Sequence, residues 1–135
     1  MPFLEWKDAY NIGVKEIDMQ HRGLFDIIDK LFTSRMYESD GKYFVLTLHK
    51  FYEYVQIHFS TEERYMEEAQ YPRFTEHQQE HELFTAQVSK LMQDVENKEP
   101  EIENRALAFL KEWYLAHILG TDRDLEKWFR EKGFA

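Results

Sequence analysis

Two pairs of residues at helical spacing offer side chains that bind metal ions. His58 and Glu62 are four residues apart, and so are His77 and His81. Residues four apart lie one turn from each other on the same face of an α-helix. Each pair therefore presents two ligand groups side by side, which makes metal binding the first chemistry to consider.

Five of the six histidines are expected to face the protein interior: His21, His58, His77, His81 and His117. His49 lies nine residues before His58, on the opposite side of the same predicted helix, and we assign it to solvent. Burying a histidine without a partner is costly because its ring nitrogens lose water. Five inward histidines therefore need one group that satisfies them together, and a metal centre is such a group.

The ligand types restrict the metal. Imidazoles and carboxylates without sulfur favour iron, zinc, copper or nickel over calcium and magnesium. Five histidines exceed the three protein ligands of a catalytic zinc ion, so the sequence indicates two metal ions, with Glu62 and Asp122 as bridging carboxylates. If two octahedral irons also share a bridging oxo or hydroxo group, these ligands leave one position open for one small ligand.

Another kind of metal site in helical bundles is the carboxylate-rich di-iron centre, which requires Glu-x-x-His on two helices. No glutamate stands three residues before any of the six histidines, so this alternative is disfavoured. Neutral imidazoles leave the metal core with a low net charge. Our hypothesis is that this ligation stabilises ferrous iron and favours reversible O2 binding over cleavage of the O–O bond.

His117 and Asp122 are five residues apart, in the segment HILGTD. On a regular helix this spacing leaves the second side chain about 140° away from the first, so the two side chains would not share a site. Gly120 lies between them and has no side chain, so we expect it to let the backbone bend or bulge at this turn. We therefore predict an irregular turn between His117 and Asp122.

The elements that must position these residues are long helices, because five Gly and three Pro interrupt only a few places in 135 residues. We predict one domain over residues 1–135, all-α in class, forming an antiparallel up-down-up-down four-helix bundle. The predicted segments are an N-terminal arm at 1–17, bundle helices at 18–37, 42–69, 75–97 and 100–119, and a short terminal helix at 122–132. Asp18 is the expected N-cap of the first helix, and Pro100 the expected start of the fourth.

Composition excludes several classes of function. The net charge of −9 argues against nucleic-acid binding, which needs basic surface, and against docking on anionic membranes. The absence of cysteine excludes disulfides and thiol chemistry. The sequence has no signal-peptide pattern and no apolar run long enough to span a membrane, so we expect a soluble cytoplasmic protein, and a monomer.

Several motifs together resemble the hemerythrins, of the bacterial single-domain kind. They are W-x-x-x-Y-x-x-G from Trp6 to Gly13, D-x-Q-H from Asp18 to His21, HFSTEE at 58–63, H-x-x-x-H at 77–81 and HILGTD at 117–122. The resemblance covers nearly the whole chain. It implies a bundle that holds two iron ions, bridged by an oxo or hydroxo group and by Glu62 and Asp122.

The resemblance also divides the ligands between the two irons. His77, His81 and His117 would hold one iron, and His21 and His58 the other, which keeps the open position for O2. Small anions would bind the ferric form. The pocket wall would comprise Leu24, Phe59, Trp113, Tyr114 and Ile118, with Leu119 near the rim. We expect Glu63 to be a solvated helix residue rather than a ligand.

Tyr114 departs from the family pattern, which usually has leucine after the tryptophan. We hypothesise that its hydroxyl approaches the open iron; alternatively, the ring packs in the core with the hydroxyl pointing outward.

Three functions stay open at this point: a non-enzymatic O2-binding protein, for which the ligand set argues most strongly, a di-iron oxidase or peroxidase, and an iron- or oxygen-sensing regulatory module. The sequence offers no nucleophile motif or nucleotide loop in favour of an enzyme.

Overall fold

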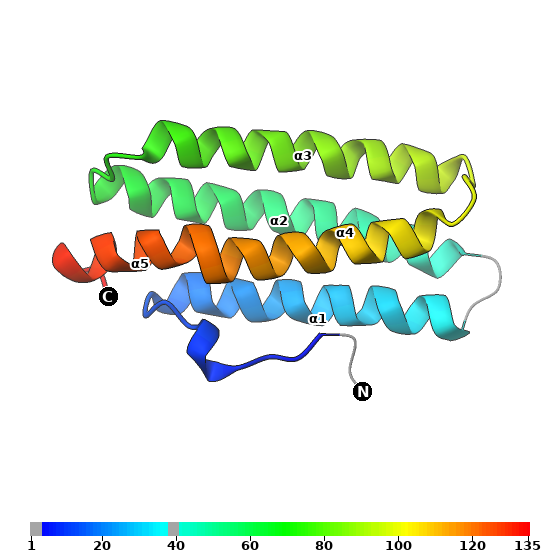
Figure 1. Ribbon diagram of the computed structural model, residues 1–135, viewed down its shortest axis with the longest axis horizontal. Helices are drawn as coiled ribbons and strands as arrows, with labels where there is room; N and C mark the ends of the chain where they lie inside the picture. The colour runs from blue at the N-terminus through cyan, green and yellow to red at the C-terminus, as the bar shows by residue number, and fades with distance from the viewer. Residues whose placement is uncertain (1–3, 38–40) are drawn as a thin grey trace.

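In the part of the chain that this computed structural model describes, residues 4–37 and 41–135, four long helices run antiparallel to their neighbours in sequence (Figure 1). They are α1 Lys15–Tyr37, α2 Lys42–Glu68, α3 Phe74–Glu96 and α4 Ile102–Ala116. Helix α1 packs against α2 and α4, and α3 packs against the same two helices. The predicted all-α up-down-up-down bundle is confirmed.

Apolar residues form two buried clusters, one on each side of the histidines. The larger cluster runs along most of the bundle and includes Ile28, Phe51, Val88 and Leu110. The smaller one lies at the other end and includes Ile12, Ile17, Met66, Leu125 and Phe129. On α1 and α2 the inward histidines fall between residues of one cluster and residues of the other. The two clusters therefore enclose a polar layer that crosses the bundle.

The N-terminal arm, predicted at 1–17, is shorter in the structure because α1 begins at Lys15 rather than at Asp18. Residues 1–3 of the predicted arm lie outside the described residues. The carboxylate of Asp18 is not an N-cap. It accepts hydrogen bonds from the backbone N–H groups of Ile12 (2.7 Å) and Gly13 (3.1 Å). Asp18 thus fastens the arm to the first turn of α1.

The predicted fourth helix and the short terminal helix form one continuous helical path (Figure 1). Helix α4 begins at Ile102, not at Pro100, because Glu101 has a left-handed backbone with φ 58°. It ends at Ala116 and continues through a π-helical segment, His117–Thr121, into α5, Asp122–Glu131. Among the described residues, we find no helix whose length and hydropathy would let it cross a bilayer.

Candidate metal centre

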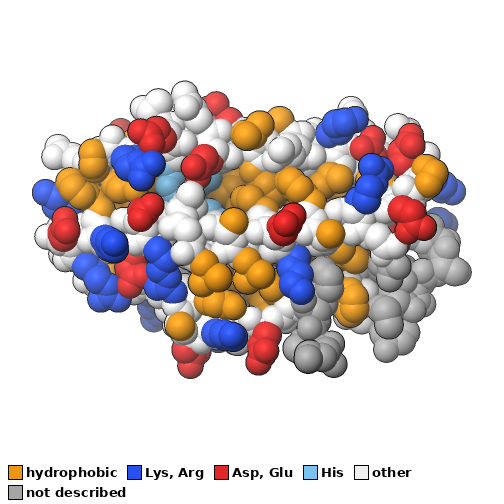
Figure 2. Space-filling model, viewed as in Figure 1, with side chains coloured by type: hydrophobic (Ala, Val, Ile, Leu, Met, Phe, Trp, Pro, Cys, Tyr) orange, Lys and Arg blue, Asp and Glu red, His pale blue; other side chains and the backbone are white. Residues whose placement is uncertain are grey.

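Seven side chains from α1, α2, α3, the π-helical segment after α4 and the start of α5 meet in the polar layer. They are the five predicted histidines and the two predicted carboxylates: His21, His58, Glu62, His77, His81, His117 and Asp122. Each is at most 6% exposed. In Figure 2 only a small area of histidine is visible on that face of the molecule, beside a longer strip of hydrophobic side chains.

The carboxylate of Glu62 reaches histidines on two sides. Its Oε2 atom lies 2.7 Å from Nε2 of His58 and 3.0 Å from Nε2 of His117. Its Oε1 atom lies 2.9 Å from Nε2 of His77 and 3.2 Å from Nε2 of His81. One carboxylate thus contacts ligands from α2, α3 and the π-helical segment, with a different oxygen on each side.

Asp122 spans the same two sides. Its Oδ2 atom lies 2.8 Å from Nε2 of His21 and 3.1 Å from Nε2 of His117, and its Oδ1 atom lies 3.8 Å from Nε2 of His77. Asp122 is therefore close to His21 and His117 and more distant from His77, and it belongs to only one of the two groups into which the donor atoms divide.

The donor atoms divide into two overlapping groups that are compact enough for one metal ion each. One group contains His21, His58, Glu62, His117 and Asp122, and the other contains Glu62, His77, His81 and His117; within each group the donor atoms lie within 4.8 Å of one another. Glu62 belongs to both groups, as a bridging ligand would. His117 also belongs to both, so its assignment to the ion of His77 and His81 stays a prediction.

Buried polar atoms in the centre lack hydrogen bonds of acceptable geometry within the described residues. They include Nε2 of His21, Nε2 of His81 and both carboxylate oxygens of Asp122. His21 Nε2 and Asp122 Oδ2 are close, at 2.8 Å, but they are not aligned for a hydrogen bond. Such atoms are costly in a protein interior, and a metal ion would satisfy them together, so the residues fit a metal centre.

Electrostatics in the polar layer also favour a cation. Burial lowers the pKa of His58 to about 4. Burial acts in the same direction at His21, His77 and His117, but the carboxylates of Glu62 and Asp122 outweigh it and raise the pKa of all three. Burial acts to raise the pKa of Glu62 and of Asp122, yet the neighbouring histidines, above all His117, hold both below their usual range. Ionised carboxylates thus attract positive charge into a dry interior.

Comparison with known proteins agrees with this geometry. The family model described as the Hemerythrin HHE cation binding domain matches residues 12–129. The chain belongs to the hemerythrin family. The bacteriohemerythrin of Stenotrophomonas maltophilia is 32% identical over 126 residues, which cover 91% of this chain and 79% of that protein.

Two further hemerythrin relatives align over most of the chain. The bacteriohemerythrin of Clostridium acetobutylicum is 29% identical over 123 residues, which cover 88% of this chain and 95% of that protein. That of Ralstonia nicotianae is 25% identical over 133 residues, covering 98% and 93%. The match therefore extends over the helices that carry all seven ligand residues.

Two residues that orient the hemerythrin ligands were missed or misassigned from the sequence. Nδ1 of His58 lies 2.9 Å from Oε1 of Gln20, and Nδ1 of His81 lies 2.9 Å from Oε2 of Glu63. Amide and carboxylate oxygens accept hydrogen bonds, so Nδ1 of each ring carries the proton and donates it to these oxygens, which leaves Nε2 free to bind a metal ion. Glu63 was expected to be a solvated residue, but its side chain is only 25% exposed. The sequence offered one indication of their role, because Gln20 is next to His21 and Glu63 is next to Glu62.

The predicted irregular turn between His117 and Asp122 is confirmed. The backbone N–H of Asp122 donates to the carbonyl of His117, five residues earlier, which is the hydrogen bond that defines a π-helix. This wider turn brings both side chains to one face. The turn does not require glycine on steric grounds, because a Cβ atom at Gly120 would meet nothing within 4 Å and its φ is not in the left-handed region.

Aromatic rings from the predicted pocket wall cover two of the histidines. Phe59 stacks on His81 with ring centroids 3.8 Å apart, and Trp113 stacks on His117 at 4.9 Å. Leu24 and Ile118 are fully buried. Leu119 is 51% exposed, so it lies outside this wall. The hemerythrin centre is therefore enclosed by apolar and aromatic surface.

Neither expectation for the Tyr114 hydroxyl is met. The ring is fully buried, and the hydroxyl donates a hydrogen bond of 2.7 Å to the backbone carbonyl of His21. The hydroxyl therefore has a protein partner on α1, and it neither points outward nor uses its proton at the metal centre.

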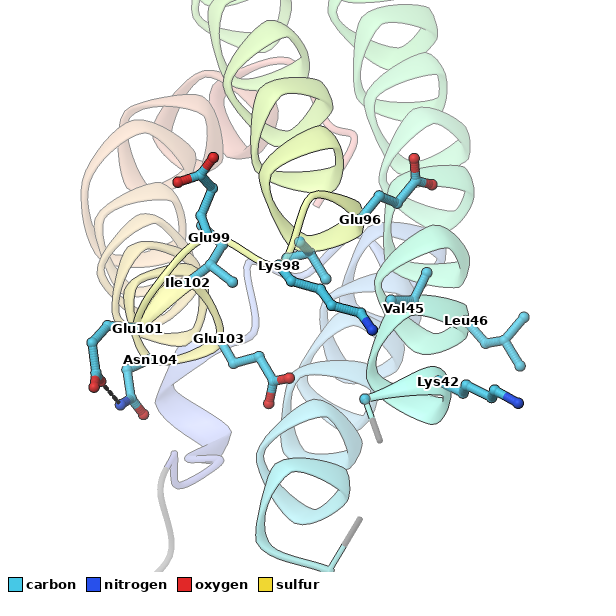
Figure 3. Close-up of a pocket in the computed structure, with 12 residues that line it drawn as sticks. Lys42, Val45, Leu46, Glu96, Lys98, Glu99, Glu101, Ile102, Glu103 and Asn104 are labelled. Carbon is cyan, nitrogen blue, oxygen red and sulfur yellow. Dashed lines mark hydrogen bonds between the residues drawn. The ribbon is translucent and has the colours of Figure 1, made fainter. Parts of the chain in front are cut away.

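A pocket lies at the opposite end of the bundle from the smaller apolar cluster, where α2 and α4 begin and α3 ends (Figure 3). It measures about 960 Å³ and its lining includes Val45, Lys98 and Ile102. Nearby, Nε2 of His49 lies 3.2 Å from Glu96, and the side chain is 43% exposed, as expected for a residue outside the centre.

Proposed function

We propose that the protein holds two iron ions in the polar layer and binds O2 reversibly at one of them, as a carrier, store, delivery protein or sensor of oxygen. The observation that carries the proposal is the ligand set: five imidazoles surround two carboxylates, and each carboxylate reaches histidines on both sides. Family membership supports iron over the other metals that this set would accept.

In the proposed centre, Glu62 and Asp122 would hold both ions, which would also share an oxo or hydroxo group. His77, His81 and His117 hold one ion, and His21 and His58 hold the other. The ion held by His21 and His58 would keep one position open for O2. When bound, the two irons would supply the electrons for reversible O2 binding.

The surrounding residues make binding selective for small ligands. Phe59 and Trp113 stack on ligand rings, and Leu24 and Ile118 are buried without exposed surface. Such a wall excludes bulk water, which protects a reactive centre from side reactions. We propose binding rather than catalysis because neutral nitrogen ligands dominate the set.

The test is to purify the protein, count its iron, and record visible spectra without oxygen, with oxygen and after oxygen is removed. About two irons per chain and a charge-transfer band that appears and disappears with oxygen are expected. Irreversible bleaching with turnover of peroxide would indicate an enzyme, and clearly less than two irons per chain would overturn the proposal. A variant complements this test. In Asp122→Asn the side chain loses its negative charge and one of its two oxygens, so the protein should hold less iron than the wild type.

A further inference from the structure

Glu63 lies where a surface groove meets the metal centre. The groove runs between α2 and α3, measures about 490 Å³, and is lined in part by Phe59, Glu63, Gln78, His81 and Thr85. Glu63 contributes no ligand atom to either group of the centre. Its contact is with the outer edge of His81, on the side away from the carboxylates.

Glu63 is held firmly in this position. Its Oε2 atom accepts the Nδ1 proton of His81 at 2.9 Å, and its Oε1 atom accepts a hydrogen bond of 3.1 Å from the side-chain amide of Gln78. Both oxygens are therefore engaged, one by a ligand and one by a neighbour on α3. The carboxylate is fixed by two contacts rather than free to turn in solvent.

The contacts that the structure records at Nδ1 of His58 and at Nδ1 of His117 come from uncharged groups. Nδ1 of His58 faces the amide oxygen of Gln20 at 2.9 Å, and Gln20 in turn donates to the hydroxyl of Thr61 at 2.9 Å. Nδ1 of His117 lies 3.4 Å from the hydroxyl of Thr121. His58 and His81 belong to different ligand groups, so the two groups have unequal outer partners.

This difference has a direct effect on the ligands. A carboxylate that accepts the Nδ1 proton makes the imidazole more basic at Nε2 and fixes its orientation. A hydrogen bond to an ionised acceptor is roughly twice as strong as one to a neutral acceptor. A more basic ligand donates more electron density to its metal ion, which favours the higher oxidation state.

We propose that Glu63 is a positioning residue that makes the two metal positions unequal. Acting through His81, it strengthens metal binding on that side and lowers the reduction potential of that ion relative to the ion held by His58. The effect on potential rests on the proposed iron function; the effect on metal binding does not.

The first test compares Glu63→Gln with Glu67→Gln by titrating metal-free protein with cobalt(II) in the absence of oxygen. Glu67 is exposed and one turn farther along α2, so both variants lose one negative charge from the same helix. A loss of about 10- to 100-fold in affinity for one of the two cobalt ions is expected for Glu63→Gln only. Equal affinities in the two variants would overturn the proposal.

The second test measures the reduction potential of the iron-loaded proteins. Glu63→Gln should raise the potential, by about 59 mV for each tenfold loss of ferric over ferrous binding. Gln20→Glu places a carboxylate at His58 and should lower it. Glu63→Asp keeps the charge and should lie nearer the wild type than Glu63→Gln does. If Glu63→Gln lowers the thermal stability but leaves the reduction potential unchanged, the role of Glu63 is only structural and the proposal is overturned.

The two proposals fail in different ways. If the wild type binds two cobalt ions but its iron form takes up no oxygen, the O2-binding function is wrong, and the cobalt comparison still decides the role of Glu63. If the wild type binds no cobalt, both proposals are overturned.

Discussion

The hydroxyl of Tyr114 donates its proton to the backbone carbonyl of His21, 2.7 Å away, and so links α4 to α1 directly behind a metal ligand. Burial also raises the pKa of Tyr114, so the phenol stays protonated and this bond persists over the working pH range. The side chain that departs from the family pattern therefore acts on packing rather than on a bound ligand.

Tyr114→Phe tests that relationship. The ring remains, and the lost hydrogen bond should lower the free energy of unfolding by about 1 kcal/mol, measured by chemical denaturation. Iron content and the rate of autoxidation should match the wild type, because the hydroxyl does not serve the open position. A changed autoxidation rate in this variant would show that the hydroxyl does reach the bound ligand.

Gly23→Ala should destabilise the contact between α1 and α2. A Cβ atom at Gly23 would overlap the hydroxyl and ring of Tyr54, and overpacking of this kind costs about 1–3 kcal/mol. Thermal unfolding of the metal-free protein measures the loss. Adding Tyr54→Phe removes the atom nearest to the new Cβ and should restore part of the stability. If the double variant instead loses the sum of the two single-variant losses, the side chains at positions 23 and 54 do not meet.

Gly120→Ala should stabilise the protein, in contrast to Gly23→Ala. Alanine at this position meets nothing and needs no unusual backbone angle, and it is about 1 kcal/mol more favourable than glycine in a helix. The variant should unfold at a slightly higher temperature and bind metal as the wild type does. Loss of one metal ion in elemental analysis would show that the π turn needs glycine after all.

Metal loading should release protons near neutral pH. His21, His77 and His117 have raised pKa values in the metal-free centre, and only the neutral ring binds metal. Titrating metal into protein in buffers of different ionisation enthalpy measures the protons released. Heats that do not depend on the buffer would contradict the expected protonation state.

The same shifts give the metal-free protein a pH-dependent stability. A raised pKa in the folded state contributes stability below the ordinary value of 6.5, and this contribution is lost as the pH rises through the folded pKa values. Above pH 6.5, where His58 with its lowered pKa is neutral in both the folded and the unfolded state, the melting temperature of the metal-free form should therefore fall with rising pH, while that of the loaded form should not. Parallel melting curves for both forms would refute this.

The repeating spacing of apolar residues and histidines was enough to predict the bundle and to identify the seven residues that the structure brings together in the polar layer. Spacing within one helix determines which side chains share a face, so His58 with Glu62 and His77 with His81 could be paired without a structure. The odd spacing of His117 and Asp122 also carried information, because only an irregular turn joins them.

Contacts between helices were harder to predict. Whether Gln20 and Glu63 contact histidines depends on how α1, α2 and α3 are rotated about their axes relative to one another. The sequence of one helix does not determine that rotation. The start of α1 was misplaced because Asp18 has the residue type of an N-cap but binds the arm from within the first turn. The hydroxyl of Tyr114 likewise found its partner on a distant helix.

Because of the π turn, His117 and Asp122 lie on the same face although they are five residues apart in the chain. This turn holds one residue more than the α turn that would replace it, and that extra residue is taken up locally, so α5 continues the path of α4. Shortening the segment by one exposed residue, such as Leu119, would place His117 and Asp122 four apart on a regular helix, again on one face. Chains that differ in length at this point can thus build the same centre, and a sequence search for it should tolerate a gap here.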